Sequence, residues 1–156
     1  FDEEEAECPT GTTENGELDG KKLCQIDGSS SITSDLRLSN GDELIYELVG
    51  PVFVGVDRGP DPAAPLAGSA AASLTIDAGV TVVGEGNDDY LVIARGSRLL
   101  SNGTEAQPVV FTAKTVVDGT IAALDQDTKG VWGGIVINGR APINACTPAS
   151  STLVHA

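Results

Sequence analysis

A short motif that recurs along the chain limits its fold more than any other feature. The segment LTIDAGVTVV, which starts at Leu74, aligns with the segment LVIARGSRLL, which starts at Leu91. In both segments apolar residues at alternate positions precede a glycine, and a second apolar run follows it. Residues 36–44 and 135–143 share the pattern, the latter with its glycine one place earlier. Alternation with a period of two is typical of strands, and glycine permits a left-handed corner between them.

Units of this kind bury their apolar face only by stacking on one another. We therefore predict an all-β fold, a parallel β-helix (β-solenoid). The composition agrees, because apolar residues make up 40% of the chain, aromatic residues only 4%, and methionine is absent. The core must then be built from Val, Ile, Leu and Ala. An antiparallel β-sandwich also gives short strands with glycine turns and is the main alternative.

The first part of the chain differs from the rest in composition. Residues 1–19 carry eight acidic residues and no basic residue. Acidic segments with few apolar residues pack poorly. We predict that residues 1–30 form an irregular acidic N-terminal arm or cap. Residues 31–156 are predicted to form the β-solenoid domain, which we expect to be incomplete or continued by a neighbouring subunit.

The charge of the chain and the lengths of its apolar runs each exclude one class of partner. The formal net charge is −14, from 23 acidic and 9 basic residues. Nucleic acid binding needs clustered Lys and Arg, so we expect no nucleic acid partner. The sequence contains no apolar run of the length that a membrane helix needs, so we expect no membrane insertion.

The three cysteines stand at positions 8, 24 and 146. Cys8 and Cys24 flank a segment rich in Gly, Thr and Asn, and we predict a disulfide that closes this loop and stabilises the fold by about 3 kcal/mol. Such a bond implies an oxidising compartment. Cys146 is then an unpaired thiol, or it pairs with another chain or with a cysteine beyond residue 156. Three free thiols are the alternative.

Three segments taken in order carry a longer pattern: LTIDAGVTVVG, LVIARGSRLLSNGTEAQPVVFTA and GVWGGIVINGRAPIN. Over residues 32–144 the chain resembles a largely uncharacterised group of secreted or cell-surface proteins of Gram-negative bacteria, which share the motif WGG-[LI]-V-x-x-G-x-A-P-I-N. The matching residues are Arg95, Gly96, Gly103, Thr104, Pro108, Phe111, Thr112, Trp132, Gly133, Gly134, Ala141, Pro142, Ile143 and Asn144. The resemblance implies a right-handed parallel β-helix outside the cell, and it transfers no catalytic residues.

Two features could serve polysaccharide chemistry. Trp132 is the only tryptophan, and it is a candidate glycan contact because the glycines after it allow close approach. A tryptophan that covers one side of the solenoid is the alternative. If the repeats stack, Asp77 lies near Arg95, and an arginine beside carboxylates resembles the catalytic groups of β-helical polysaccharide lyases. A surface ion pair explains these two residues equally well.

One loop has the composition of a cation site. The segment GEGNDDY brings together the oxygen-bearing side chains of Glu85, Asn87, Asp88 and Asp89. Hard cations such as Ca²⁺ prefer oxygen ligands, so these residues are a candidate structural Ca²⁺ site. The segment matches neither an EF-hand nor the GGxGxD repeat, and a solvated loop is the alternative. We expect no other cofactor.

No catalytic centre is predicted. The single histidine, His155, argues against a zinc enzyme or a Ser–His–Asp triad. We predict a non-enzymatic structural protein, secreted to the extracellular space or the outer cell surface, that self-assembles head-to-tail into a filament or surface layer. A glycan-binding or adhesion module with a polysaccharide partner is the first alternative, and a polysaccharide lyase fragment is the second.

Overall fold

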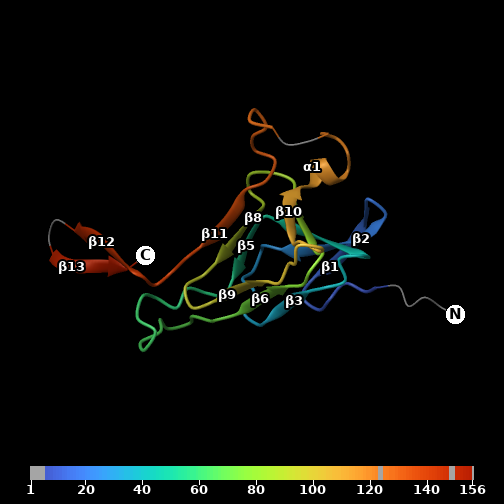
Figure 1. The fold of residues 1–156 in the computed structure, drawn as a ribbon. Coiled ribbons are helices and arrows are strands. Elements are labelled where there is room, and N and C mark those ends of the chain that lie inside the picture. Colours follow the sequence, from blue (N-terminus) through green and yellow to red (C-terminus); the bar gives the residue numbers. More distant parts are fainter. Residues whose placement is uncertain (1–5, 123–124, 148–149, 156) are drawn as a thin grey trace.

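A computed structural model describes residues 6–122, 125–147 and 150–155, and the side chains of the last two strands lie outside this description. The strands form three sheets, which we name A, B and C, and one separate hairpin (Figure 1). Sheet A holds, in spatial order, β1 (Thr13–Leu18), β2 (Lys21–Asp27), β4 (Leu44–Val49), β7 (Thr81–Gly84) and β10 (Val110–Ala113). Sheet B holds β5 (Pro51–Val54), β8 (Tyr90–Ile93) and β11 (Gly134–Ile137), and sheet C holds β3 (Leu36–Leu38), β6 (Ser73–Ile76) and β9 (Arg98–Ser101). The hairpin pairs β12 (Pro142–Thr147) with β13 (Ser150–His155), and one helical turn, α1 (Lys114–Val117), follows β10.

The chain enters the three sheets in cyclic order. In a first round β2 and β3 enter sheets A and C, and Ile32 between them bridges to sheet B. β4, β5 and β6 enter sheets A, B and C in a second round, β7, β8 and β9 do so in a third, and β10 and β11 begin a fourth. Strands of successive rounds pair in parallel, as in the ladder that joins β3, β6 and β9 along the lower edge of Figure 1. The predicted all-β class is therefore confirmed. We call one round of three strands a rung.

The predicted repeat, from Leu74 to Leu91, is not the length of a rung. Leu74 pairs with Leu99 in sheet C, well beyond Leu91 in the sequence. Leu91 lies in sheet B, where it pairs with Val52 and Ile135. The aligned positions therefore lie in different sheets, and the start of the first segment (β6) stacks on the end of the second (β9) instead of on its start. The two segments look alike in the sequence because strands of each sheet bury alternate aliphatic residues and the chain turns at a glycine after them.

The interior is aliphatic, as the composition predicts. Its fully buried side chains include Ile26, Leu38, Leu48, Leu74 and Ile93. Tyr46 is the aromatic exception. Its hydroxyl donates to the Ser39 carbonyl at 2.8 Å and accepts the Ser39 N–H at 3.1 Å, which satisfies the polar end of an otherwise buried ring.

The predicted irregular arm is wrong for residues 13–27, which form the β1–β2 hairpin. Asp19 and Gly20 make its two-residue turn with φ of 52° and 73°, the left-handed values of a type I′ turn. β2 then pairs in parallel with β4 along its length and buries Cys24 and Ile26 in the core. A boundary after residue 30 therefore separates β2 from the sheet to which it belongs. β1 runs antiparallel to β2 and forms the outer strand of sheet A.

Candidate functional site

The fourth, incomplete rung leaves core positions of sheet B uncovered among the described residues. Ile135 stacks on Leu91, and Ile137 stacks on Ile93. Leu91 and Ile93 are each 1% exposed, whereas Ile135 is 36% and Ile137 is 65% exposed. We call residues that stack in register on successive strands a column. The two columns whose side chains are buried in β8 are thus exposed to solvent in β11. Within the described residues β11 pairs only with β8, and an apolar strand edge of this kind favours addition of a further strand.

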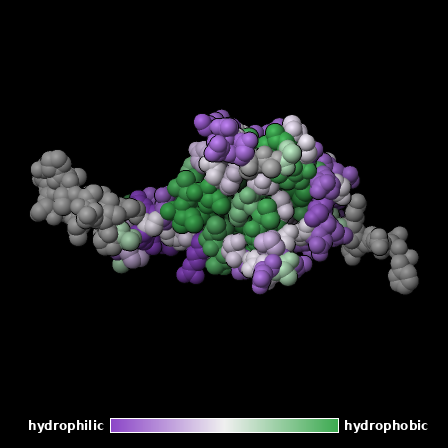
Figure 2. All heavy atoms as spheres, turned by 45° about the horizontal axis from the view of Figure 1, so that its top comes forward, coloured by the Kyte–Doolittle hydropathy of each residue, from purple (hydrophilic) through white to green (hydrophobic). Residues whose placement is uncertain are grey.

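The outer face of sheet B is also apolar. Phe53, Val92 and Val136 stack in one outward column, and Phe53 and Val136 are 37% and 48% exposed. The rings of Phe53 and Tyr90 meet edge to face, with centroids 6.4 Å apart. Figure 2, in which the side that carries sheet B is turned forward, shows a large apolar area on the surface. This face is a second candidate contact surface.

Trp132 lies against the core. Its ring is half-buried and stacks on Phe111, with ring centroids 6.3 Å apart and an interplanar angle of 11°. The following glycine permits close packing, because a Cβ at Gly133 would lie 2.5 Å from the Asn87 carbonyl oxygen and 2.7 Å from the Tyr90 Cβ. The geometry matches the structural alternative for Trp132. A glycan contact at this residue stays a prediction.

Cys8 and Cys24 form the predicted disulfide, with a Cα–Cα distance of 5.6 Å. Cys24 is fully buried, and Cys8 packs against the main core. The bond holds the segment before β1 across the first rung. Cys146 lies in β12, and its side chain is outside the described residues.

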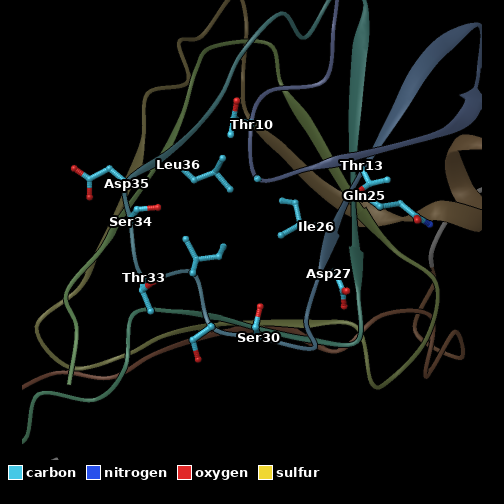
Figure 3. A pocket seen from close by; sticks show the side chains of 13 residues that line it. Thr10, Thr13, Gln25, Ile26, Asp27, Ser30, Thr33, Ser34, Asp35 and Leu36 are labelled. Atoms are coloured by element: carbon cyan, nitrogen blue, oxygen red, sulfur yellow. The ribbon is translucent and has the colours of Figure 1, made fainter. Parts of the chain in front are cut away.

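A hollow of about 270 Å³ opens at the first rung, beside the segment that Cys8 anchors. Ile26, Ile32 and Leu36 are among its lining residues. Figure 3 shows Ile26 and Leu36 pointing into it, with the hydroxyl groups of Thr10 and Ser30 around them. Among the described residues, no Lys or Arg lines it. The hollow is thus a small pocket with apolar side chains at its base, at the N-terminal end of the core.

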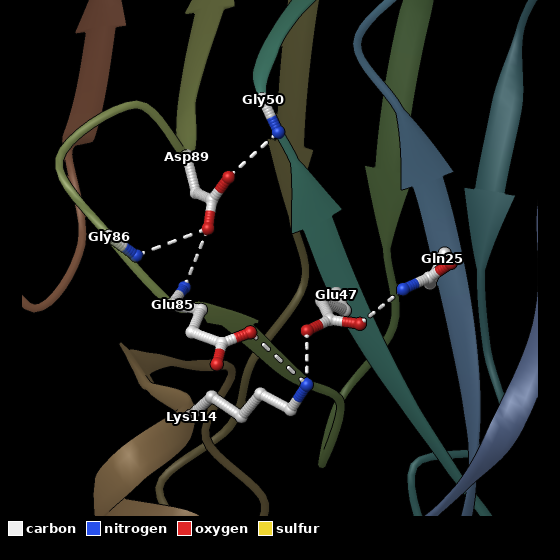
Figure 4. Close-up of polar contacts among 7 residues, drawn as sticks. All are labelled: Gln25, Glu47, Gly50, Glu85, Gly86, Asp89 and Lys114. Atoms are coloured by element: carbon white, nitrogen blue, oxygen red, sulfur yellow. Dashed lines mark hydrogen bonds and ion pairs between the residues drawn. The ribbon is translucent and has the colours of Figure 1, made fainter.

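The oxygen-rich loop is organised by one of its own carboxylates. Asp89 Oδ2 accepts the N–H groups of Glu85 and Gly86 at 2.7 and 3.1 Å, and its Oδ1 accepts the Gly50 N–H at 2.7 Å (Figure 4). These bonds tie the loop to the end of β4. Glu85, Asn87 and Asp88 are exposed. Within the part of the chain that the structure describes, no group of three His, Cys, Asp or Glu side chains is placed to hold a metal ion, and Ca²⁺ binding stays a prediction.

The expected neighbours Asp77 and Arg95 have different partners. Arg95 donates from Nε and Nη2 to both carboxylate oxygens of Asp57, at 2.8 and 2.6 Å. Asp77 accepts from Arg37 Nε at 2.9 Å. The hydrogen bonds from Arg95, together with the Gly59 N–H, lower the pKa of Asp57 to about 2. A surface ion pair between Asp77 and Arg95 is therefore wrong as well, because the two segments do not stack at the expected spacing. Each residue instead forms an ion pair with a different partner.

A buried ionic cluster escaped the sequence analysis. Glu47 is only 3% exposed although it is an acidic residue, and it lies on the buried strand β4. Its carboxylate accepts from Lys114 Nζ at 2.7 Å and from Gln25 Nε2 at 2.7 Å, and Lys114 also reaches Glu85 at 3.4 Å (Figure 4). The Glu47 hydrogen bond raises the pKa of Lys114. The only sequence signal was an acidic residue inside the apolar run LIYELV.

This cluster lies beside a second, smaller core. Leu18, Leu23, Ile45 and Val83 are buried together, and Val117 of α1 packs against them. These side chains share the outer face of sheet A with Glu47, because Ile45 and Glu47 stand at alternate positions of β4. The hairpin and α1 therefore cover a face that would otherwise meet water, and Lys114 anchors α1 there.

A family comparison agrees with the cyclic order of parallel strands. A family model described as a pectate-lyase like beta helix domain matches residues 63–155. The chain belongs to this family. No curated protein and no solved structure matches the chain. Within the described residues, no helix is long and apolar enough to cross a bilayer. Membership of the pectate-lyase like beta helix family gives the fold, and the reaction or binding activity must be argued from the site itself.

Proposed function

We propose that this chain is a non-enzymatic extracellular structural protein whose copies stack head-to-tail into a filament or surface layer. One observation carries the proposal, namely the change in exposure from Ile93 (1%) to Ile137 (65%) within a single core column. Burying apolar surface contributes roughly 25 cal/mol per Å², so covering this column favours association. A second copy is the occupant that we assign to this end.

The charge distribution supports stacking of one end on the other. Residues 1–43 contain twelve acidic and three basic residues, whereas residues 90–156 contain four acidic and five basic. Two acidic ends facing each other would repel, but an acidic end facing a nearly neutral end would not. Head-to-tail contact is heterologous, and it propagates into an open filament unless a rotation closes it into a ring.

Two further observations support an extracellular location of the protein. Cys8 and Cys24 form a disulfide, and disulfides form and persist mainly in oxidising surroundings. The sequence also resembles secreted or surface proteins of Gram-negative bacteria, and from this resemblance we infer the right-handed winding of the helix. Cys146 is the cysteine left to cross-link neighbouring copies, since Cys8 and Cys24 are paired with each other.

The assignment as a non-enzyme is supported by the ion pairs. The lyase alternative required Asp77 beside Arg95, yet each side chain is paired with a different residue, Arg37 and Asp57 respectively. Arg95 in its bidentate pair holds its proton more tightly, because the Asp57 hydrogen bond raises its pKa. An arginine in this state is a poor proton acceptor.

Negative-stain electron microscopy and sedimentation velocity of the full chain test the proposal. We expect filaments or a concentration-dependent series of oligomers, which Ile137→Glu abolishes. Leu66→Glu is the matched control, because Leu66 is 52% exposed in the loop between β5 and β6. A wild-type chain that stays monomeric at all concentrations would refute the proposal. Loss of the filaments in reductant would implicate the cysteines in holding them.

A glycan-binding adhesion module is the second candidate, and the Phe53–Tyr90 pair favours it. The two rings lie on the outer face of sheet B, and Phe53 is 37% exposed. Sugars stack their C–H faces on exposed aromatic rings, for which this pair is better placed than the half-buried Trp132. Binding of neutral and acidic polysaccharides by wild type but not by Phe53→Ala would support this function, whereas equal binding by both proteins would count against it.

A further inference from the structure

Sheet C lacks the strand of the fourth rung that the other two sheets have. Sheet A reaches this rung with β10 and sheet B with β11, whereas sheet C ends at β9 within the described residues. Leu74 of β6 is 1% exposed, but Leu99, which stacks on it from β9, is only half-buried. Leu100, on the other face of β9, is 45% exposed. The interior of the β-helix is therefore open at β9.

The outer edge of β9 carries backbone groups that are ready for a partner. The N–H groups of Arg98 and Asn102 donate to carbonyl groups on the β6 side, at 3.0 and 2.8 Å. Backbone groups of alternate residues point to the same side of a strand, so those of Leu99 and Ser101 point to the opposite edge. Within the described residues no strand pairs with that edge. Such an edge is a template for one further strand.

The sequence has a matching segment at the position of the missing strand. Leu99 follows Leu91 of β8 by eight residues, and Ile143 of β12 follows Ile135 of β11 by the same number. Leu91 and Ile135 stack on each other in sheet B. The segments LVIARGSRL and IVINGRAPI therefore align without a gap. In this alignment Ile143 takes the position of Leu99 one rung later.

The chain keeps to this register for some distance beyond β11. Asn138, the residue after β11, donates its N–H to the Ile93 carbonyl at 3.0 Å, as Ala94, the residue after β8, does to β5 at 3.0 Å. Arg140 is in the same way the equivalent of Gly96, and its Nη2 lies 2.8 Å from the position that a Cβ on Gly96 would take. The chain thus follows the corner of the third rung as far as Arg140. Only then does it leave for the β12–β13 hairpin, which extends away from the three sheets in Figure 1.

We propose that the β12–β13 hairpin folds back onto the sheets, so that β12 pairs in parallel with β9 and completes the fourth rung. Ile143 then covers Leu99. β13 stays antiparallel on the outer edge of β12, as β1 is antiparallel on the outer edge of β2 at the other end of the molecule. Pro142 falls opposite Arg98, at the first position of the strand, where the missing N–H of a proline is tolerated. The closed hairpin covers the open end of the core at sheet C and leaves the outer edge of β11 free.

The strand that closes the rung belongs to the same chain. The link between β8 and β9 has four residues, 94–97, and the link between β11 and β12 also has four, 138–141. The shorter path that already spans this corner is therefore available to β12. A second copy cannot fill the place with its own β3, because its β2 and Ile32 would then lie where β10 and β11 already are. The inference does not depend on the stacking proposed above, since the closure takes place within one chain.

A pair of introduced cysteines in the full chain tests the closure. Leu100→Cys and Asn144→Cys, made together in a Cys146→Ala background, are directly opposite in the proposed register. We expect mild oxidation to join them within one chain at least about tenfold faster than it joins the control pair, Val110→Cys with Asn144→Cys in the same background. Val110 is 39% exposed and lies in sheet A. Non-reducing electrophoresis and peptide mass spectrometry measure the cross-link. Equal rates for the two pairs, or a cross-link between two chains, would overturn the proposal.

Hydrogen exchange followed by NMR tests the closure without new cysteines. The N–H groups of Leu99 and Ser101 should exchange on the order of tenfold more slowly in wild type and in Ile143→Val than in Ile143→Asp, whose carboxylate opposes burial against the core. The Asn102 N–H, which bonds within sheet C at 2.8 Å, should stay protected in all three proteins and shows that each is folded. If the Leu99 and Ser101 N–H groups exchange equally fast in wild type and in Ile143→Asp, β12 does not close the rung.

Discussion

Lys114 Nζ lies 2.7 Å from Glu47 Oε1, and this contact joins α1 to the centre of sheet A from a distant part of the sequence. The Glu47 side chain is 4% exposed and that of Lys114 is 22% exposed. Removing the lysine would leave a buried carboxylate with only the Gln25 amide as partner among the described residues. Such an uncompensated charge is costly in a protein interior.

We expect Lys114→Met to destabilise the fold by about 3 kcal/mol. The matched control is Arg37→Met, which breaks the exposed Arg37–Asp77 pair (side chains 70% and 24% exposed) and should cost about 0.5 kcal/mol. Urea unfolding of both variants measures the difference. Equal losses of stability would show that burial of Glu47 does not decide the energy of its ion pair.

The pH dependence of the Asp57–Arg95 pair follows from the lowered pKa of Asp57. The pKa falls from 3.8 to about 2, chiefly through the Arg95 hydrogen bonds. The folded state therefore binds this proton less tightly than the unfolded state. The contribution of the pair to stability is present above pH 3.8 and is lost as the pH falls through about 2. Carboxyl NMR titration should give a midpoint near 2 in wild type and a higher one in Arg95→Ala; an unchanged midpoint would contradict the assigned cause.

Loss of the Cys8–Cys24 disulfide should destabilise the first rung. The bond closes a loop with a sequence separation of 16, and the double change Cys8→Ala, Cys24→Ala should lower the free energy of unfolding by about 3 kcal/mol. Cys146→Ala is the control, and we expect it to leave monomer stability unchanged. Denaturant unfolding with and without reductant measures both. A wild-type protein indifferent to reductant would argue against a structural role for the bond.

Gly133→Ala should disturb the start of β11. The new Cβ would lie 2.5 Å from the Asn87 carbonyl oxygen, which is backbone and cannot move aside cheaply, so we expect a loss of about 2 kcal/mol. Gly86→Ala is the control in the same loop region, because nothing lies within 4 Å of a Cβ at Gly86. Trp132 fluorescence during thermal unfolding reports both variants. Similar melting temperatures would show that the loop yields to the methyl group.

The sequence allowed the class of fold to be predicted but not the length of a rung. Alternation and glycine corners predicted strands correctly, because both are local properties. The spacing from Leu74 to Leu91 misled, because these two positions look alike and lie on different sheets. The true stacking distance also varies, since Leu91 is separated from its partner Ile135 by about twice the stretch of chain that separates Lys22 from Leu44. Loops of unequal length hide this period from any fixed alignment.

The hairpin and the buried cluster were missed for different reasons. Asp19-Gly20 is a strong turn signal between alternating residues. The excess of acidic residues around it instead led to the prediction of an irregular arm. The burial of Glu47 had no local signal. It results from α1, which lies far later in the chain and folds back over sheet A. The disulfide was predicted because loop closure between two nearby cysteines depends on sequence separation alone.

The β1–β2 hairpin has a consequence for how the chain folds. Its strands are joined by the short turn at Asp19 and Gly20, whereas β8 finds β11 only across the long segment from Leu91 to Ile135. Because the entropic cost of closing a loop rises with its length, we expect the hairpin to form sooner than the β8–β11 pair. Every later strand then meets an edge that the previous rung has already built. The molecule is therefore suited to folding in the direction of its synthesis, one rung at a time from the N-terminus.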